Sequence, residues 1–417
     1  MTEKHWLAAP ATLRERWLLF LCFVYATVER MPDVVLRGRL WAEEGPVFYL
    51  HAATTHGLRA VFWSYAGYLN LGASLAAFAA RHLVVPDFAP RVTLVFAALA
   101  QLSPAFLLVT SHARWLRHPL ALAAALLLLV SAPSAEEVWL NTLHSQFFLA
   151  LSAALILALE IGSARMEWFR RALLFLAPLY GLPAIMLLPL FILRAALERS
   201  RPRGYQALAL AAGALIQLLL FYHMPSARQS HDYRLILGAI FAKNLLLPFL
   251  GYGGEAHSAA WLYHWLSHDV LPRRVPIALL AALAGIVVLL ARGPREAWWL
   301  FFAFGIVCVL SWYGALLPQA AEVLPHIGGR YAFVPQILVE FTILAIAAAG
   351  TGWRRLVAIV LTTWLCGVSS LAYVQTAQVF KTGPDWRQEM AKWHQNPDYH
   401  PHLWPDDWML PLPRPAS

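Results

Sequence analysis

Long apolar stretches separated by short polar segments run through the whole chain. The segment 120–130 consists almost entirely of Ala and Leu, and 207–222 and 275–291 carry no charge. A helix needs about 20 mostly apolar residues to cross the hydrocarbon core of a bilayer. The pattern predicts about eleven membrane-spanning helices, at 14–29, 88–110, 118–134, 145–161, 170–181, 182–197, 205–222, 274–292, 296–316, 331–350 and 354–374. The fifth and sixth are short and meet at Gly181, so they form either two tight spans or one re-entrant pair.

The composition agrees with this pattern. The chain is 60% hydrophobic and only 13% charged, whereas a soluble domain carries about 25% charged residues. One soluble core could not bury so many apolar runs, so the predicted fold class is an all-α integral membrane protein. The net charge of +9 does not indicate nucleic-acid binding, because the basic residues lie singly or in pairs at the ends of apolar runs. All cysteines lie inside apolar runs, where we interpret them as packing residues: Cys22, Cys308 and Cys366.

The distribution of charge predicts which ends of the spans face the cytoplasm. With the N-terminus inside, the inner loops and span ends hold 16 basic and six acidic residues, an excess of +10, while the outer ones hold 16 of each. Short cytoplasmic loops of membrane proteins are enriched in Lys and Arg. The same rule predicts that the apolar stretch 68–85 lies along the outer surface, since a crossing there would move Arg114 and Arg117 outside. The N-terminus is therefore predicted inside and the C-terminus outside.

The outer segments are predicted to be longer than the inner loops. They comprise 29–87, 135–144, 223–273, 317–330 and 375–417. We divide the chain into a transmembrane domain, 1–374, whose first outer loop is 29–87, and an outer tail, 375–417, which is rich in Pro and Trp. A protein with short inner loops and elaborate outer segments is expected to act at the outer face.

Two adjacent carboxylates, Glu43 and Glu44, lie in the first outer loop just before Gly45 and Pro46. The Gly-Pro pair would fix the turn that presents them. One carboxylate can act as a general base toward an attacking hydroxyl group. The other can bind a divalent cation or hold the acceptor. The alternative interpretation is a solvated helix N-terminus, where the helix dipole stabilises acidic side chains.

The second outer segment holds Glu137, Asn141 and His144. Their spacing, i, i+4 and i+7, would place them on one helix face at the mouth of the fourth span. A carboxylate, an amide and an imidazole on one face could coordinate a cation or a phosphate–metal pair. The alternative is a polar helix cap that faces lipid headgroups.

Arg330 and Tyr331 begin the tenth predicted span, directly after Gly328 and Gly329. An arginine at the outer interface can bind a phosphate through two parallel hydrogen bonds. The alternative is an Arg330 side chain that extends to the headgroups, with Tyr331 in the aromatic belt of the membrane.

The outer segment 223–273 contains polar residues without metal-ligand spacing: His223, Arg228, His231, Asp232, Tyr233, Arg234, Lys243, Glu255, His257 and His264. We interpret most of them as solvated loop residues, with lipid-phosphate binding as the alternative. Glu340, inside the tenth span, is either a functional intramembrane acid or a neutral group hydrogen-bonded within the bundle. The chain has no Gly-x-x-x-x-Gly-Lys sequence, so direct use of ATP is not expected.

An acidic motif in the first outer loop, followed by surface helices and a second span, resembles the layout of the C-superfamily glycosyltransferases. These are polytopic enzymes that use lipid-phosphate-linked sugars. The segments 41–48 and 65–68 are similar to a bacterial branch of this superfamily, and 136–144 resembles its second acidic site. The Arg-Tyr pair that enters a late span is similar to a recurrent element of the bacterial transferases.

The resemblance implies roles for these residues. Glu44 or Glu43 would be the catalytic base, and the donor phosphate would be bound by Arg330, Tyr331 and Lys243. The metal or acceptor would be bound by Glu137, Asn141 and His144. Such first loops usually carry at least one Asp, whereas here both acids are Glu. This departure leaves open which residue is the base and whether Mg²⁺ or Mn²⁺ is needed.

The sequence thus predicts an inverting glycosyltransferase of the bacterial inner membrane, with its C-terminus in the periplasm. It would move a hexosyl or pentosyl group from polyprenyl phosphate to a glycan, lipid or protein of the cell envelope, with membrane lipids but no nucleic acid as further partners. The alternatives are a non-enzymatic lipid or glycan transporter (a flippase) and a membrane scaffold. The absence of a visible internal repeat and the gathering of polar residues at one face favour the enzyme.

Overall fold

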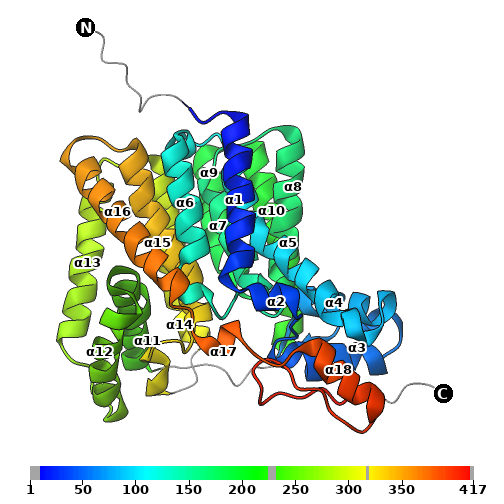
Figure 1. Cartoon of the computed structure of the whole chain (residues 1–417). Coiled ribbons are helices and arrows are strands. Elements are labelled where there is room, and N and C mark those ends of the chain that lie inside the picture. The colour runs from blue at the N-terminus through cyan, green and yellow to red at the C-terminus, as the bar shows by residue number, and fades with distance from the viewer. Residues whose placement is uncertain (1–9, 224–231, 316–318, 414–417) are drawn as a thin grey trace.

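The computed structural model describes residues 10–223, 232–315 and 319–413, and these residues form a helical bundle (Figure 1). The α-helices are α1 (Leu13–Arg30), α2 (Pro32–Leu36), α3 (Leu50–Thr54), α4 (Leu71–Leu83), α5 (Ala89–Thr110), α6 (Pro119–Ser131), α7 (Ser145–Ala158), α8 (Ala164–Tyr180), α9 (Leu188–Glu198), α10 (Arg201–His223), α11 (Tyr233–Ala239), α12 (Leu247–Ser267), α13 (Arg274–Leu290), α14 (Arg295–Ala315), α15 (Gly329–Ala349), α16 (Gly352–Val374), α17 (Gln378–Lys381) and α18 (Trp386–Gln395). Two short antiparallel strands, β1 (Ser64–Tyr65) and β2 (Tyr68–Leu69), form the sheet of the described chain, with Ser64 opposite Leu69.

Each of the eleven predicted spans coincides with a helix, but their lengths differ. Six helical segments are long and apolar enough to cross a membrane: Pro86–Thr110, Arg201–Tyr222, Tyr233–Ser267, Arg295–Gly314, Gly329–Ala349 and Gly352–Val374. Five of these are predicted spans, whereas Tyr233–Ser267 was predicted to be an outer loop. Three more apolar helices, α6, α7 and α13, are shorter. The chain is therefore an all-α protein with the helices of a multi-pass membrane protein.

The two ends of the bundle differ in structure. At one end the helices are joined by short connections, and Arg194 and Arg203 both pair there with Glu198, at 2.7 and 3.0 Å. The other end carries α2, α3, α4, α17 and α18 (Figure 1), and we call it the loop-rich end. The predicted surface helix 68–85 is α4, which lies at this end.

The turn between α8 and α9 reaches the loop-rich end. A side chain at Gly72 of α4 would collide with the ring of Tyr180, the last residue of α8, and one at Gly181 would collide with Gln146 of α7. Since α4 lies at the loop-rich end, α8 extends from the short-loop end to the opposite end before the chain turns. Glycine is therefore required at 181 for this close packing.

The stretch 233–267 is a helical hairpin. Gly251, with φ of +66°, interrupts the helix, and the legs then run back along each other, since Gly238 packs against Leu262 and Leu266. At the bend, the carbonyl of Phe249 accepts a hydrogen bond from Trp364 in the middle of α16, at 2.8 Å. We call this segment the α11–α12 hairpin. It enters the bundle from the loop-rich end (Figure 1), so the prediction of a solvated loop here was wrong.

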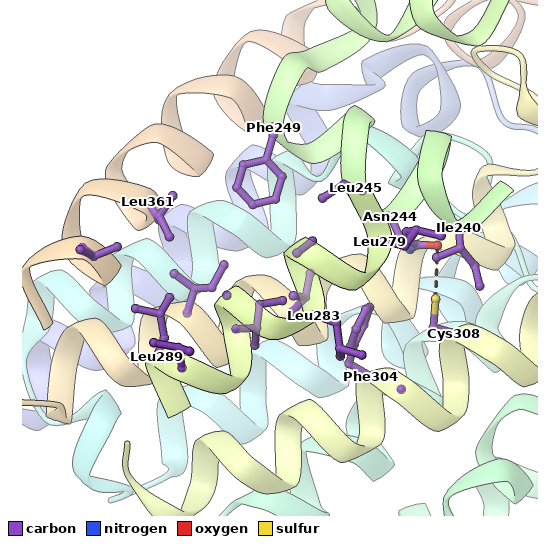
Figure 2. Close-up of a pocket in the computed structure, with 18 of the residues that line it drawn as sticks. Ile240, Asn244, Leu245, Phe249, Leu279, Leu283, Leu289, Phe304, Cys308 and Leu361 are labelled. Carbon is purple, nitrogen blue, oxygen red and sulfur yellow. Dashed lines mark hydrogen bonds between the residues drawn. The ribbon is translucent and has the colours of Figure 1, made fainter. Parts of the chain in front are cut away.

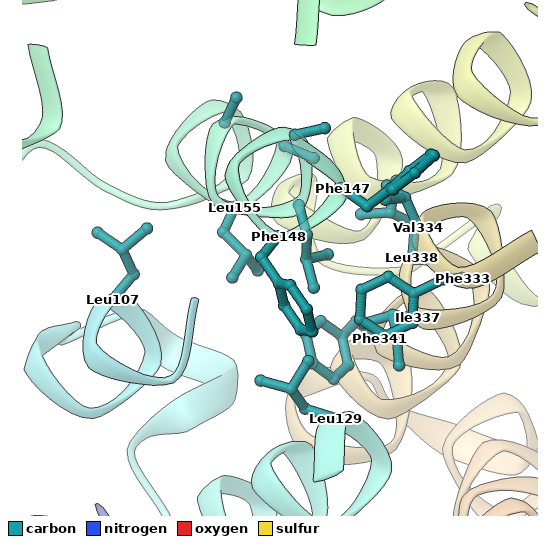
Figure 3. Packing of buried hydrophobic residues seen from close by; sticks show 14 of the residues in the cluster. Leu107, Leu129, Phe147, Phe148, Leu155, Phe333, Val334, Ile337, Leu338 and Phe341 are labelled. Carbon is teal, nitrogen blue, oxygen red and sulfur yellow. The ribbon is translucent and has the colours of Figure 1, made fainter. Parts of the chain in front are cut away.

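The core of the bundle is centred on α7 and α15, which are buried on nearly all sides. Phe148 of α7 packs edge-to-face on Phe333 of α15, with ring centroids 4.9 Å apart, and Phe341 lies in the same cluster (Figure 3). A helix that is apolar on every side is expected at the centre of a membrane bundle. This packing therefore fixes the first turns of α7 and α15, which adjoin the polar residues of 136–144 and Arg330.

The tail folds onto the first loop. The carbonyl oxygen of Trp404 accepts a hydrogen bond from the backbone N–H of Ala42 at 2.5 Å. The backbone N–H of Trp404 donates one to the carbonyl oxygen of Leu40 at 3.2 Å. Phe380 of α17 stacks on Trp41, with centroids 5.5 Å apart. These contacts place the tail directly over the segment that contains Glu43 and Glu44.

Candidate functional site

Glu44 is buried and fully engaged by its own protein. One carboxylate oxygen accepts hydrogen bonds from the backbone and hydroxyl of Thr142, both at 2.5 Å, and the other accepts one from the Trp41 backbone at 2.7 Å. Burial raises the pKa of Glu44, although these hydrogen bonds and Arg39 act against the shift. Glu44 thus connects the first loop to the segment before α7. Its carboxylate has a structural role.

Glu43 has a different environment. Its side chain is half-buried, and within the described chain its carboxylate takes part in no hydrogen bond or ion pair. A carboxylate that is free of protein partners can accept a proton from a bound hydroxyl group. Of the two predicted catalytic acids, the geometry therefore favours Glu43.

The predicted helix face formed by Glu137, Asn141 and His144 does not exist, because 136–144 consists of turns and Leu140 has a positive φ of 48°. The residues nevertheless meet. The amide nitrogen of Asn141 donates to the carbonyl of Glu137 at 2.9 Å, and Nδ1 of His144 lies 3.0 Å from the same carbonyl. Asn141 and His144 thus share the carbonyl oxygen of Glu137. The two side chains stabilise this turn and do not surround an empty ligand site.

The carboxylate of Glu137 instead forms an ion pair with the Arg330 guanidinium, and it also accepts the backbone N–H of Arg330 at 3.1 Å. Burial alone would raise the pKa of Glu137, but the charge of Arg330 and the hydrogen bonds that Arg330 donates outweigh that effect and hold the pKa below its usual value. The Arg330 side chain remains 32% exposed and lies over the ring of Tyr331, 4.7 Å from its centroid. The Arg330 guanidinium can therefore contact a ligand while it stays paired with Glu137.

His144 is neutral in this setting. Burial lowers its pKa to about 4, because the charges of Arg330 and Arg39 add to the desolvation and outweigh the attraction of Glu137. A neutral imidazole that already lies against a backbone carbonyl has one ring nitrogen left for a ligand.

Lys243 does not face an open phosphate site. Its ammonium group pairs with Glu255 at 2.9 Å and also contacts the carbonyl of Leu324. Both side chains of the pair are fully buried between the legs of the α11–α12 hairpin. Of the other polar residues predicted in this loop, Arg234 pairs with Asp232 and Asp269. The candidates Arg228 and His231 lie outside the described residues.

Glu136 was given no separate role by the sequence analysis, yet it joins three segments. Its carboxylate accepts a hydrogen bond from Tyr252 of the hairpin at 2.8 Å and one from the backbone of Ala377 at 2.8 Å, and it contacts His326. The ring of His326 stacks on Tyr252, with centroids 4.3 Å apart. The only available signal was its position next to Glu137. We call the charged groups gathered here the ionic cluster: Glu136, Glu137, Lys243, Glu255, His326 and Arg330.

A cavity of about 670 Å³ opens between the α11–α12 hairpin and the neighbouring helices of the bundle (Figure 2). Side chains of the hairpin, α13, α14, α15 and α16 line it, and nearly all of them are apolar. Its polar side is formed by Asn244, which accepts a hydrogen bond from Trp312 at 2.8 Å and donates one to the carbonyl of Ala332 at 3.2 Å. Asn244 follows Lys243, and Ala332 lies two residues after Arg330, so the cavity adjoins the ionic cluster.

The residues predicted to bind a cation do not fit one as they are arranged. Glu137 is neutralised by Arg330, and Asn141 uses its amide nitrogen and its oxygen on the backbone of Glu137 and His144. In the described ranges, no three side chains of His, Cys, Asp or Glu come together in a way that could hold a metal ion.

Comparison with protein-family models, curated proteins and solved structures finds no match for this chain. The likeness to the C-superfamily glycosyltransferases therefore rests on the motifs quoted above, and the functional argument rests on the geometry of the site.

Proposed function

We propose that the chain is a membrane glycosyltransferase that takes its sugar from a polyprenyl-phosphate donor at the loop-rich end. The observation that carries this proposal is the apolar cavity, whose one polar side, at Asn244, adjoins the ionic cluster through Lys243 and Ala332. A polyprenyl phosphate has the same two parts, a long apolar chain and a charged head. A cavity of about 670 Å³ also falls within the range of about 300–1,000 Å³ that is usual for small-molecule sites.

In this proposal the isoprenoid chain occupies the cavity and the phosphate lies at Arg330. The partly exposed guanidinium offers several N–H donors in one plane, a geometry that matches phosphate oxygens. Glu137 orients Arg330 from the other side through the ion pair. Lys243 lies in the same cluster but is paired with Glu255 and does not touch the head group.

Glu43 is the proposed catalytic base. It takes the proton of the acceptor hydroxyl, the oxygen forms a bond to the anomeric carbon, and the bond from that carbon to the donor phosphate oxygen breaks. The phosphate leaves with the electron pair, and Arg330 balances its charge. A single displacement of this kind inverts the anomeric carbon. Glu44 is assigned a positioning role, because its hydrogen bonds to Thr142 hold the loop that presents Glu43.

The topology predicted from charge belongs to the same proposal. The chain crosses the bacterial inner membrane about eleven times, with the short-loop end in the cytoplasm and the loop-rich end in the periplasm. The basic residues at the short-loop end support this orientation. An acceptor of the cell envelope would then approach from the side that carries Glu43 and the tail.

Mass analysis of envelope glycans from cells with and without the protein tests the proposal. We expect one glycan to lack a hexose or pentose when the protein is missing, and to regain it with the wild-type chain but not with Glu43→Gln. A flippase would require the lipid to cross the bilayer and would tolerate Glu43→Gln. Restoration by Glu43→Gln would therefore refute the enzymatic assignment.

A further inference from the structure

Helix α15 carries a carboxyl group, Glu340, into the centre of the bundle, and the proposed transfer reaction does not use it. Glu340 is completely buried. One of its carboxyl oxygens accepts a hydrogen bond from the Gln336 amide at 3.0 Å. The other is buried without a hydrogen-bond partner in the described chain. A polar atom without a hydrogen bond in an apolar interior costs folding free energy, so we expect this oxygen to bind a ligand.

Helix α16 contributes two more unpaired polar atoms. The hydroxyl oxygens of Thr362 and Ser369 are buried and have no partner among the residues that the structure covers. Together with Cys366 they repeat at i, i+4 and i+7, so they lie on one helix face. Thr362 and Ser369 are both on the buried side of α16, and α15 packs along α16. The two hydroxyls therefore lie in the interior of the bundle, on the helix next to the one that carries Glu340.

Within the described residues Glu340 takes part in no ion pair, and its hydrogen bond comes from the neutral Gln336 amide. The 3-10 turn Arg114–Leu116 packs on α15, but the side chain of Arg114 is exposed. Arg30, the buried arginine at the end of α1, donates to the carbonyls of Val130 and Ala132. An ionised carboxylate without a cation is very unfavourable in such a place, whereas a protonated one needs only hydrogen bonds.

We propose that Glu340, Thr362 and Ser369 form an internal site that binds a proton and ordered water. The proton resides on the carboxyl group, and water completes the hydrogen bonds of the three unpaired oxygens. A buried water needs two to four polar partners. Thr362 and Ser369 are seven residues apart, about 10 Å along the helix, so each hydroxyl holds its own water. The site is separate from the donor cavity, which α15 borders through Val339 and Ile343.

A polar row joins this site to the loop-rich end. The Gln336 side-chain oxygen accepts a hydrogen bond from the hydroxyl of Ser134 at 2.5 Å. Ser134 lies two residues before Glu136, a member of the ionic cluster. Hydrogen bonds through Ser134 and Gln336 thus link the buried carboxyl of Glu340 to the segment that contains Glu136.

Infrared spectroscopy of the full-length protein in lipid nanodiscs tests this inference. Near neutral pH, the wild-type spectrum is expected to contain the C=O band of a protonated carboxyl that Glu340→Gln lacks. The band should shift on transfer to D₂O, and the shift should be slower in Thr362→Val combined with Ser369→Ala. The matched control Glu255→Gln, at another buried carboxyl that is paired with Lys243, should keep the band.

Two results would overturn the inference. If wild type and Glu340→Gln have the same spectrum in the C=O region at pH 6–8, the carboxyl is ionised and binds no proton. If the band is present but does not shift in D₂O, the site is dry. If Glu340→Gln does not fold, ¹³C-glutamate labelling of Glu340→Asp assigns the band instead. The label shifts the C=O bands of all glutamates, and the unlabelled aspartate at position 340 keeps an unshifted band.

Discussion

Glu43 and Glu44 are neighbours in the chain, but their surroundings separate their roles. We expect Glu43→Gln to reduce transfer by about 10²–10⁴-fold, the usual effect of losing a general base, and to leave thermal stability unchanged. Glu44→Gln replaces an acceptor of three N–H and O–H groups by an amide that cannot accept from all of them. It should lower the free energy of unfolding by about 1.5–3 kcal/mol. Full activity in the folded Glu43→Gln variant would remove Glu43 from the mechanism.

Arg330 tests the phosphate site. Lysine is a point charge without the planar fork of arginine, so Arg330→Lys should weaken binding of the lipid-phosphate donor by about 1.5–3 kcal/mol. Titration calorimetry in detergent measures this change, and the thermal midpoint shows whether the variant stays folded. A Lys variant that binds the donor normally would mean that Arg330 only anchors α15 at the membrane surface.

His144 makes the stability of the site depend on pH. Its pKa in the folded protein is about 4, below the ordinary value of 6.5, so the unfolded chain binds the proton more tightly. Stability should therefore fall as pH decreases from about 6.5 to about 4, by up to about 3 kcal/mol. Thermal unfolding of wild type and His144→Gln across this pH range isolates the contribution. Parallel curves for the two proteins would contradict the neutral, buried imidazole.

At the scale of elements, the α11–α12 hairpin is the feature that the sequence did not reveal. Its apolar residues are interrupted by Lys243, Glu255 and several glycines, which is typical of a loop. The burial of Lys243 depends on a partner twelve residues away, and one chain does not show that pairing in advance. The breakdown of the helix at 136–144 had a similar cause, since side chains of Glu44 and Arg330 hold the segment in turns.

The donor cavity can be tested by filling it. Gly305 of α14 and Gly285 of α13 line the cavity, and a side chain at either position would meet no atom within 4 Å. We expect Gly305→Leu to reduce binding of polyprenyl phosphate without disturbing the fold, because its side chain takes the place of the isoprenoid. Gly367→Leu is the matched control, since Gly367 of α16 is equally free of neighbours but does not line the cavity. Native mass spectrometry measures the bound lipid, and equal binding by both variants would place the lipid chain elsewhere.

At the scale of the whole molecule, the apolar runs were enough to place a helix at each of the eleven predicted spans and at α4, and five of the eleven helices are long and apolar enough to cross a membrane. Helix existence follows from apolar length, which is local information. Contacts between distant segments do not follow from it, and these define the site: the tail over 41–46, Glu136 between Tyr252 and Ala377, and Glu137 against Arg330. Sequence analysis therefore named Glu43, Glu137 and Arg330 but could not distinguish free groups from paired ones.

The central claim is that the chain moves a sugar from a lipid phosphate to an acceptor. The most direct measurement uses the purified protein in liposomes that contain lipid-linked sugars extracted from its native membrane, together with the envelope acceptor fraction. The account predicts that free polyprenyl phosphate and glycosylated acceptor appear together with wild type, and that neither appears with Glu43→Gln. If the sugar stays on its lipid while the lipid crosses the bilayer, the protein is a transporter and the account is wrong.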